Sequence, residues 1–200
     1  MTLRPVFQFK IALQGIWPLV WRRIQISDLC TFWDLHVAIQ DSMGWEDYHL
    51  HQFDVINFRT NEKERVGIPD DEWLDEVETL PGWDLRVRDY VLNSEVNQRI
   101  PYLYDFGDHW EHIIEFEGKQ EKLPGKKYPI CLAGERACPP EDVGSIRGYT
   151  HYLEVIMDPT HEEYTDMLAW RGKYHPAKFD PKKVKFDNPR KRWIKAFLEE

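Results

Sequence analysis

Apolar and polar positions near the start of the chain follow the pattern of two short strands. Residues 6–13 (VFQFKIAL) and 20–26 (VWRRIQI) are rich in β-branched and aromatic side chains, which favour strands. Gly15 and Pro18 lie between them, and both residue types interrupt regular structure. The pattern therefore predicts an opening antiparallel pair of strands.

After Thr31 the spacing changes to that of a helix. The apolar positions that recur at helical spacing are Phe32, Leu35, Ile39 and Met43. Thr31 stands at an N-cap position with Asp34 in the first turn, and Gly44 stands where a C-terminal cap belongs. We expect a helix over residues 32–43.

Strand patterns return in the middle of the chain. Residues 50–58 read as one strand, and residues 98–104 and 110–117 read as a hairpin. Alternation in the second hairpin strand predicts one buried face, formed by Trp110, His112, Ile114 and Phe116. An intervening acidic stretch predicts a solvated loop or edge region, with Glu62, Glu64, Asp70, Asp71, Glu72, Asp75, Glu76 and Glu78.

The last third of the chain differs in character from the first two. Residues 119–148 are rich in Gly and Pro, which predicts a long ordered loop without regular elements. Residues 149–157, 162–170 and 189–198 have helical spacing. Strands followed by helices are typical of the α+β class. We expect a mainly antiparallel sheet from the N-terminal two thirds, packed with the early helix and the C-terminal helices.

The formal net charge of −9 is unevenly distributed. Residues 1–170 carry 16 Lys/Arg against 31 Asp/Glu, whereas residues 171–195 carry ten Lys/Arg against two Asp. An acidic body argues against a protein that coats nucleic acid, because phosphate binding needs a basic surface. We expect one α+β domain over residues 1–170 and a basic extension over residues 171–200, whose terminal helix packs on that domain. Docking of nucleic acid or an acidic partner is the other interpretation of this extension.

The cysteine count and the apolar runs indicate the compartment. Three cysteines, an odd number, argue against a disulfide framework and favour a reducing compartment. No apolar run approaches the roughly 20 residues that span a bilayer. The sequence therefore predicts a soluble, cytoplasmic protein without a membrane partner.

Polar groups that could carry chemistry gather in two places. Asp105 and Asp108 flank a glycine in the segment YLYDFGDHWEH, where an ordinary turn would also explain them. His49 and His51 are two apart, which on a strand puts both imidazoles on one face. Together with Asp105, Asp108 or Glu141, they could complete a site for zinc or another divalent cation that activates water. Core or surface histidines are the commoner explanation of such a pair.

Several segments match one known family in the same order. They are IWPLVWRR (16–23), LH (35–36), IQ (39–40), MGW (43–45), HLHQF (49–53), YDFGDHWEH (104–112), CLAGERACPPEDVG (131–144) and GY (148–149). Together they resemble the plasmid Ri Orf-three-like family, whose members are also described as insertion-element passenger or TnpR-like proteins. The resemblance implies a mobile-element-associated protein and names no reaction. A serine recombinase needs a nucleophilic Ser near its N-terminus, whereas Ser27, the first serine here, follows the opening strands.

The matched segments predict one binding groove. We expect the Asp-Phe-Gly-Asp turn, the His49/His51 segment and the Pro-Pro-Glu-Asp loop to converge on one face, since loops on a firm scaffold carry recognition. The candidate groove residues are His49, His51, Asp105, Asp108, Trp110, His112, Glu141, Asp142 and Tyr149. The alternative is that all three segments serve only the architecture.

Three functions follow from these observations. The first is a non-enzymatic binding or accessory protein, with no catalytic residue assigned, that takes a protein or small ligand in the groove. The second is a metal-dependent hydrolase using His49, His51, Asp105, Asp108 or Glu141 with a divalent cation. The third is a nucleic-acid-binding protein that uses residues 171–195.

Overall fold

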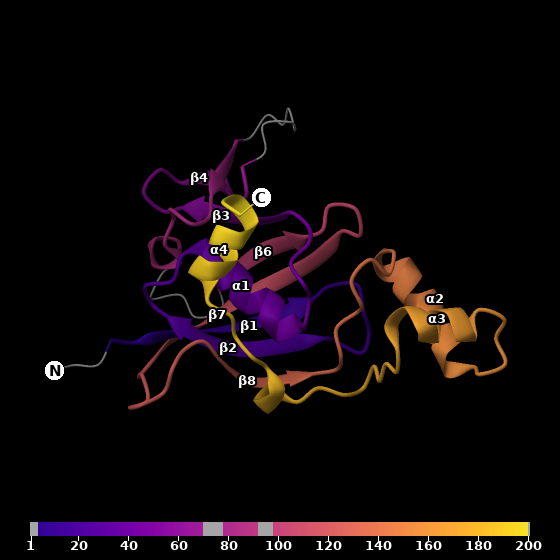
Figure 1. Ribbon diagram of the computed structural model, residues 1–200. Helices are drawn as coiled ribbons and strands as arrows, with labels where there is room; N and C mark the ends of the chain where they lie inside the picture. The colour runs from indigo at the N-terminus through magenta and orange to yellow at the C-terminus, as the bar shows by residue number, and fades with distance from the viewer. Residues whose placement is uncertain (1–3, 70–77, 92–97, 200) are drawn as a thin grey trace.

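The computed structural model describes residues 4–69, 78–91 and 98–199 (Figure 1). Its strands are β1 (Val6–Leu13), β2 (Trp21–Ser27), β3 (His51–Asn57), β4 (Glu62–Gly67), β5 (Thr79–Pro81), β6 (Gln98–Tyr104), β7 (Trp110–Gln120) and β8 (Ile130–Glu135). Its helices are α1 (Phe32–Met43), α2 (Ser145–Met157), α3 (Tyr164–Arg171) and α4 (Pro189–Phe197), with short 3-10 turns at Val87–Asp89 and Pro181–Lys183.

In the described part of the chain the strands form one eight-stranded sheet. Their order is β5-β4-β3-β6-β7-β1-β2-β8. Neighbouring strands run antiparallel, except that β4 and β5 are parallel. The sheet and the helices confirm the predicted α+β class, and β1 and β2 form the predicted opening pair.

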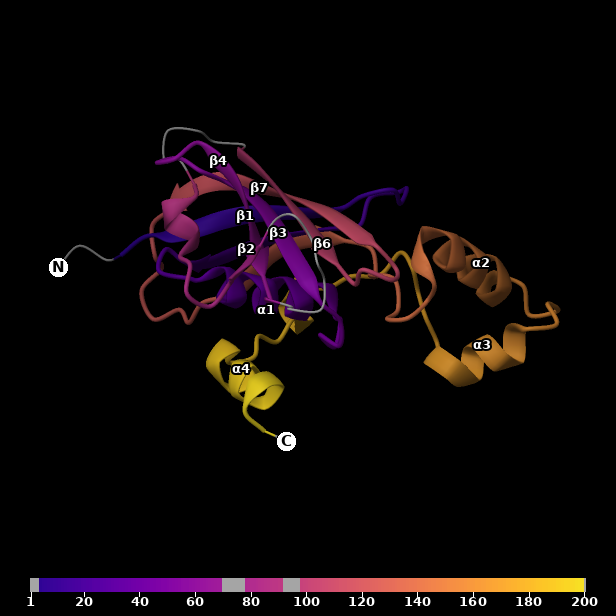
Figure 2. The ribbon, with the colours of Figure 1, turned by 90° about the horizontal axis from the view of Figure 1, so that it is seen from above.

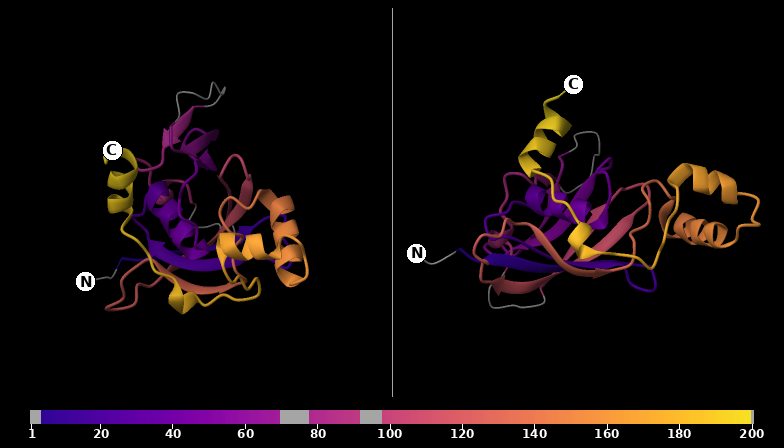
Figure 3. Two further views of the ribbon diagram at one scale, coloured as in Figure 1. Left: turned by 45° about the vertical axis from the view of Figure 1, so that its right-hand side comes forward. Right: turned by 60° about the horizontal axis from the view of Figure 1, so that its bottom comes forward.

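Helix α1 covers the predicted residues 32–43. The Thr31 side chain accepts a hydrogen bond from the Asp34 N–H at 3.1 Å, and the Asp34 carboxylate accepts one from the Thr31 N–H at 2.9 Å. Gly44 ends the helix with a φ of 90°, a left-handed conformation that favours glycine. The sheet curls around one side of α1, and α4 lies on the other side (Figures 2 and 3). As a result, most side chains of this helix are buried.

Strands β6 and β7 form the predicted hairpin. Tyr104 pairs with Trp110, and Gln98 pairs with Phe116. The predicted face of β7 is buried, because Trp110, His112, Ile114 and Phe116 are at most 1% exposed. The ring of Phe116 packs against Phe7 of β1, with ring centroids 5.2 Å apart. The core therefore lies on the α1 side of the sheet, around this aromatic contact.

Two predicted loop regions contain strands. Residues 119–148 were expected to be irregular, but β8 lies within them and pairs with the edge of β2. The six residues of β8 do not alternate between buried and exposed positions, so the sequence pattern does not mark them as a strand, and only the pairing with β2 does. In the acidic stretch, β4 and β5 form the opposite edge of the sheet, which agrees with the edge alternative. Asp70, Asp71, Glu72, Asp75 and Glu76 lie outside the described residues.

The C-terminal helices lie in two places. Helices α2 and α3 pack against each other beside one end of the sheet, with Tyr152 and Trp170 in edge-to-face contact at 5.9 Å (Figure 1). Helix α4 packs on α1, where the Trp33 indole N–H donates to the Pro189 carbonyl at 2.9 Å. Within the described residues, none of the helices has both the length and the apolar character needed to cross a bilayer.

Candidate functional site

The segment after α1 anchors the Pro-Pro-Glu-Asp loop. The Trp45 indole N–H donates to the Pro139 carbonyl at 2.9 Å, and the Glu46 N–H donates to Glu141 Oε1 at 2.7 Å. The Tyr104 hydroxyl donates to the same Glu141 oxygen at 2.9 Å. Burial, followed by Glu141, raises the pKa of Tyr104, so this hydroxyl keeps its proton. These two hydrogen bonds join residues that are separated by 94 and 95 positions in the chain.

The Asp-Phe-Gly-Asp turn is held by its own side chain. Asp105 has a left-handed φ of 58°, and its Oδ1 accepts hydrogen bonds from the N–H groups of Gly107 and Asp108 at 2.9 and 3.1 Å. Asp108 Oδ2 accepts a hydrogen bond from the Gly144 N–H at 3.0 Å, which ties the turn to the segment before α2. The second oxygen of Asp105 therefore faces away from the turn amides.

His49 lies where these segments meet. Its Nε2 is 2.8 Å from Asp142 Oδ1 and 3.6 Å from Asp105 Oδ2. One donor atom of each of the three side chains lies within 4.8 Å of the other two. We call His49, Asp105 and Asp142 the His49 cluster. Two carboxylates face a single imidazole, so the cluster has a negative potential and favours a positively charged occupant.

Four other predicted groove residues lie inside the core. His51, Trp110, His112 and Tyr149 are at most 2% exposed, so their side chains do not line an open groove. His49 precedes β3, which begins at His51, so the same-face rule for strands does not apply to this pair. Of the five metal candidates from the sequence, the structure brings His49 and Asp105 into the cluster and leaves out His51, Asp108 and Glu141. Asp142, which was predicted for the groove and not for the metal, is the third member.

The buried imidazoles have partners of different kinds. His51 stacks on His36 with ring centroids 3.4 Å apart and an interplanar angle of 8°. Burial, followed by the proximity of His36, holds the pKa of His51 well below its usual range. His112 Nδ1 lies 3.0 Å from the Trp110 carbonyl, and burial lowers the pKa of His112 to about 3. Both rings are therefore neutral parts of the core at neutral pH.

A buried polar chain that the sequence did not single out connects the core to the surface. His36 Nε2 is 2.6 Å from Asp47 Oδ1, and His36 Nδ1 is 2.9 Å from the Tyr102 hydroxyl. The Gln40 amide donates to the same hydroxyl at 3.0 Å. His36 and Gln40 are four residues apart on one helix face, and this spacing was the available signal. Burial acts to raise the pKa of Asp47, but His36 and then Arg192 outweigh it and hold that pKa below its ordinary value.

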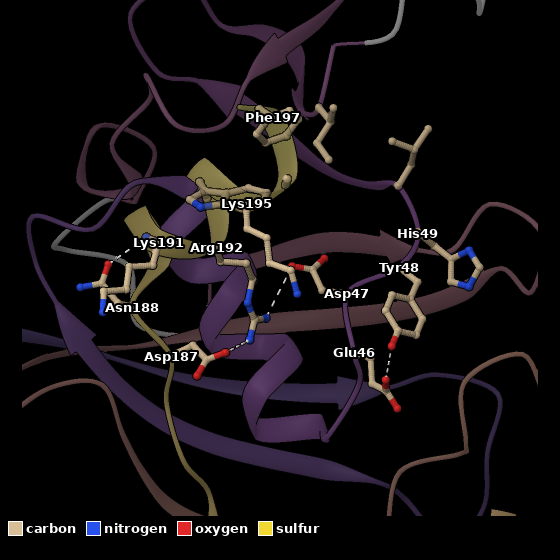
Figure 4. Close-up of a pocket in the computed structure, with 14 residues that line it drawn as sticks. Glu46, Asp47, Tyr48, His49, Asp187, Asn188, Lys191, Arg192, Lys195 and Phe197 are labelled. Carbon is tan, nitrogen blue, oxygen red and sulfur yellow. Dashed lines mark hydrogen bonds and ion pairs between the residues drawn. The ribbon is translucent and has the colours of Figure 1, made fainter. Parts of the chain in front are cut away.

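Beside His49 a groove of about 680 Å³ opens between α4 and residues 46–50 (Figure 4). Its apolar wall consists of Trp33, Leu50, Ile68 and Phe197. Its acidic side chains already have partners. Glu46 accepts a hydrogen bond from the Tyr48 hydroxyl, and Asp47 and Asp187 both form ion pairs with Arg192. Lys191 and Lys195 also line the groove, and neither forms an ion pair with a described residue.

The amino-acid sequence matches the family described as plasmid pRiA4b ORF-3-like protein over residues 5–184. This chain belongs to the plasmid pRiA4b ORF-3-like family. Membership confirms the resemblance that the order of matching segments indicated, and the matched range includes the whole His49 cluster.

Two relatives show how far the family likeness extends. The chain is 34% identical over 171 residues to the uncharacterized protein y4hQ of Sinorhizobium fredii (strain NBRC 101917 / NGR234), covering 84% of this chain and 81% of that protein. The crystal structure of MM3350 from Methanosarcina mazei Go1, a protein of unknown function, is 40% identical with a TM-score of 0.82. That match covers 92% of this chain and 100% of the other. The pRiA4b ORF-3-like relatives therefore support the fold, and any function has to be argued from the geometry.

Proposed function

We propose that this pRiA4b ORF-3-like protein is a non-enzymatic binding protein that takes a small organic anion in the groove beside His49. The observation that carries the proposal is the pairing of charges in that groove. Its carboxylates are already occupied by Tyr48, His36 and Arg192, whereas Lys191 and Lys195 have no ion-pair partner among the described residues. Lys191 and Lys195 are therefore the positive charges that remain for an acidic ligand.

The shape of the groove supports a ligand with an apolar body. A volume of about 680 Å³ lies within the range of small-molecule sites, roughly 300–1,000 Å³. Phe197 and Trp33 are in edge-to-face contact at 5.7 Å and form an aromatic wall at one end. A flat apolar group can pack on that wall while an acidic group reaches the lysines, which lie one helical turn apart.

The compartment and the other expected partner also bear on this proposal. We place the binding function in a reducing compartment, because Cys30, Cys131 and Cys138 are free thiols. Nucleic-acid binding through residues 171–195 has less support, because Arg192 is engaged by three aspartates. An acidic body behind the basic segment also repels a polyanion.

Binding of 2-naphthoate and 2-naphthyl phosphate to the full chain tests the proposal, measured by calorimetry with neutral 2-naphthalenemethanol for comparison. We expect both anions to bind more tightly than the neutral compound. The double variant Lys191→Glu/Lys195→Glu should weaken anion binding by about 10-fold or more, because charged hydrogen bonds contribute about 1.5–3 kcal/mol.

The matched control is the double variant Lys173→Glu/Lys182→Glu. Both lysines are exposed in the same basic segment, and neither lines the groove. It makes the same change in net charge, so a general electrostatic effect would appear in both double variants. Equal weakening in the two, or equal affinity for the neutral compound, would contradict the proposal.

A further inference from the structure

Three segments far apart in the chain each bring one metal-ligating side chain to the same point. His49 comes from the segment before β3, Asp105 from the turn after β6, and Asp142 from the loop before α2. The pair His49 and Asp142 is separated by 93 positions. An imidazole with two carboxylates is a donor set that zinc and other divalent transition metals accept.

The distances between the donor atoms suit one shared ion. Metal–ligand bonds of about 2.1 Å in a tetrahedral site place neighbouring donor atoms about 3.4 Å apart. His49 Nε2 is 2.8 Å from Asp142 Oδ1 and 3.6 Å from Asp105 Oδ2, values on either side of that length. All three donor atoms lie within 4.8 Å of one another, so small side-chain rotations suffice to enclose an ion.

The surrounding structure already holds two of the donors in place. Asp105 uses Oδ1 for the turn amides of Gly107 and Asp108, which leaves Oδ2 directed at His49. The ring of His49 packs edge-to-face on Tyr104 at 5.9 Å. Little side-chain freedom is therefore lost when an ion binds, and this preorganisation favours binding.

The residue before Asp142 adds an independent observation. Glu141 is 3% exposed, and its Oε1 accepts hydrogen bonds from Tyr104 and the Glu46 N–H. Its Oε2 is buried and accepts no hydrogen bond from a described residue. A carboxylate oxygen kept from both water and donors is costly. Glu141 is not a member of the His49 cluster, but the charges of His49 and Asp142 act on it, so a cation in the cluster would lower that cost.

We infer that the His49 cluster is a binding site for one divalent transition-metal ion, with zinc as its first candidate. The three side chains supply three ligands and leave a fourth position open to water or to a ligand atom. The two carboxylates balance the charge of the ion, while His49 binds as the neutral imidazole. This site goes beyond the anion groove and requires no occupant there.

Titration of the 200-residue chain with Zn²⁺, Mn²⁺ and Mg²⁺ in separate calorimetric experiments tests the site, together with the metal content of the protein as purified. We expect one zinc ion per chain. His49→Gln and Asp142→Asn should each weaken zinc binding by about 10-fold or more, since each removes a direct ligand and even indirect supports contribute about that much. Asp142 has a side chain that is 57% exposed, so its variant should fold, and circular dichroism checks this.

His151→Gln is the matched control. His151 also pairs with a carboxylate, Glu163, at 2.7 Å, and its ring lies 6.0 Å from His161, so it is the competing surface site. We expect its zinc affinity to equal that of the unchanged protein, and Lys191→Glu/Lys195→Glu should also retain the metal. The inference is overturned if the unchanged protein binds no zinc or only Mg²⁺, or if His151→Gln loses zinc while His49→Gln keeps it. Zinc binding without anion binding would contradict only the proposed anion-binding function and would leave the metal site standing.

Discussion

Replacing Arg192 with Met tests how α4 is fastened to the body. Arg192 Nη2 lies 2.6 Å from Asp41 Oδ1 and 2.6 Å from Asp187 Oδ2, and Nη1 lies 3.5 Å from Asp47 Oδ2. Methionine keeps the length of the aliphatic stem and removes the charge. The change therefore isolates the ionic contacts from the packing of the helix.

The expected loss of stability follows from the burial of the partners. The side chains of Asp41 and Asp47 are 6% and 8% exposed, and that of Arg192 is 18% exposed. Removing one partner of a fully buried ion pair costs about 3–5 kcal/mol. Partial exposure of Arg192 and the remaining contact of Asp47 with His36 reduce this to about 2–3 kcal/mol. Burial also raises the pKa of Asp41, so its protonation limits the loss.

Urea unfolding at neutral pH, followed by tryptophan fluorescence and circular dichroism, measures the change. We expect the free energy of unfolding of Arg192→Met to fall by about 2–3 kcal/mol. Amide hydrogen exchange over residues 189–197 should accelerate more than exchange in β7, because α4 loses its ion pairs with the body while β7 keeps its strand pairing. Arg190→Met is the control, since Arg190 is exposed on the same helix and has no ion pair among the described residues.

This reasoning would be refuted if Arg192→Met lost no more free energy of unfolding than Arg190→Met. The control is expected to change stability by no more than about 0.5 kcal/mol. Equal values would mean that α4 is held by aromatic contacts, such as Trp83 with Phe197 at 5.1 Å, and that the ion pairs contribute nothing measurable.

Two further predictions concern the core and the entrance to α2. Burial lowers the pKa of His112 to about 3 in the folded protein, whereas it is about 6.5 in the unfolded chain. The contribution of His112 to the free energy of unfolding is therefore fully present above pH 6.5. It falls by up to about 1.4 kcal/mol per pH unit as the pH drops toward 3. His112→Asn should reduce the slope of the free energy of unfolding against pH between 6.5 and 4.5, while His51, whose pKa is also lowered, keeps its own contribution. An unchanged slope would contradict the assignment. Gly148→Ala should destabilise by about 1–3 kcal/mol, because the added Cβ would lie 1.9 Å from the Val143 carbonyl oxygen. An unobstructed helix would instead gain about 1 kcal/mol from this change, so a rise in the thermal midpoint would refute the clash.

Elements with local signals were predictable from the sequence. Thr31, Asp34 and Gly44 set the ends of α1, because capping bonds join residues at most four apart. The alternation from Trp110 to Phe116 identified the buried face of β7, because that signal also lies within a few neighbouring residues. Strand β8 had no such pattern, because its regularity comes from pairing with β2, more than a hundred positions earlier.

The residue types of the candidate site and the convergence of its three segments were predicted, but which of their side chains meet was not. The sequence named His49, Asp105 and Asp142 together with His51, Trp110, His112 and Tyr149, which are all polar or aromatic residues near turns. The structure separates them, since the second group fills the core and only the first reaches a shared point. The groove beside α4 was missed because its walls come from helix positions whose side chains look like an ordinary amphipathic face.

By itself, the amino-acid sequence determined the α+β class, the ends of α1, the β6–β7 hairpin and the family, since these depend on neighbours along the chain. Only the tertiary structure decided that His49 meets Asp142 and that Arg192 meets Asp41, pairs separated by 93 and 151 positions. Such contacts result from the packing of whole elements against one another. Periodicity and capping describe only a few residues at a time, so they contain no information about which distant loops become neighbours.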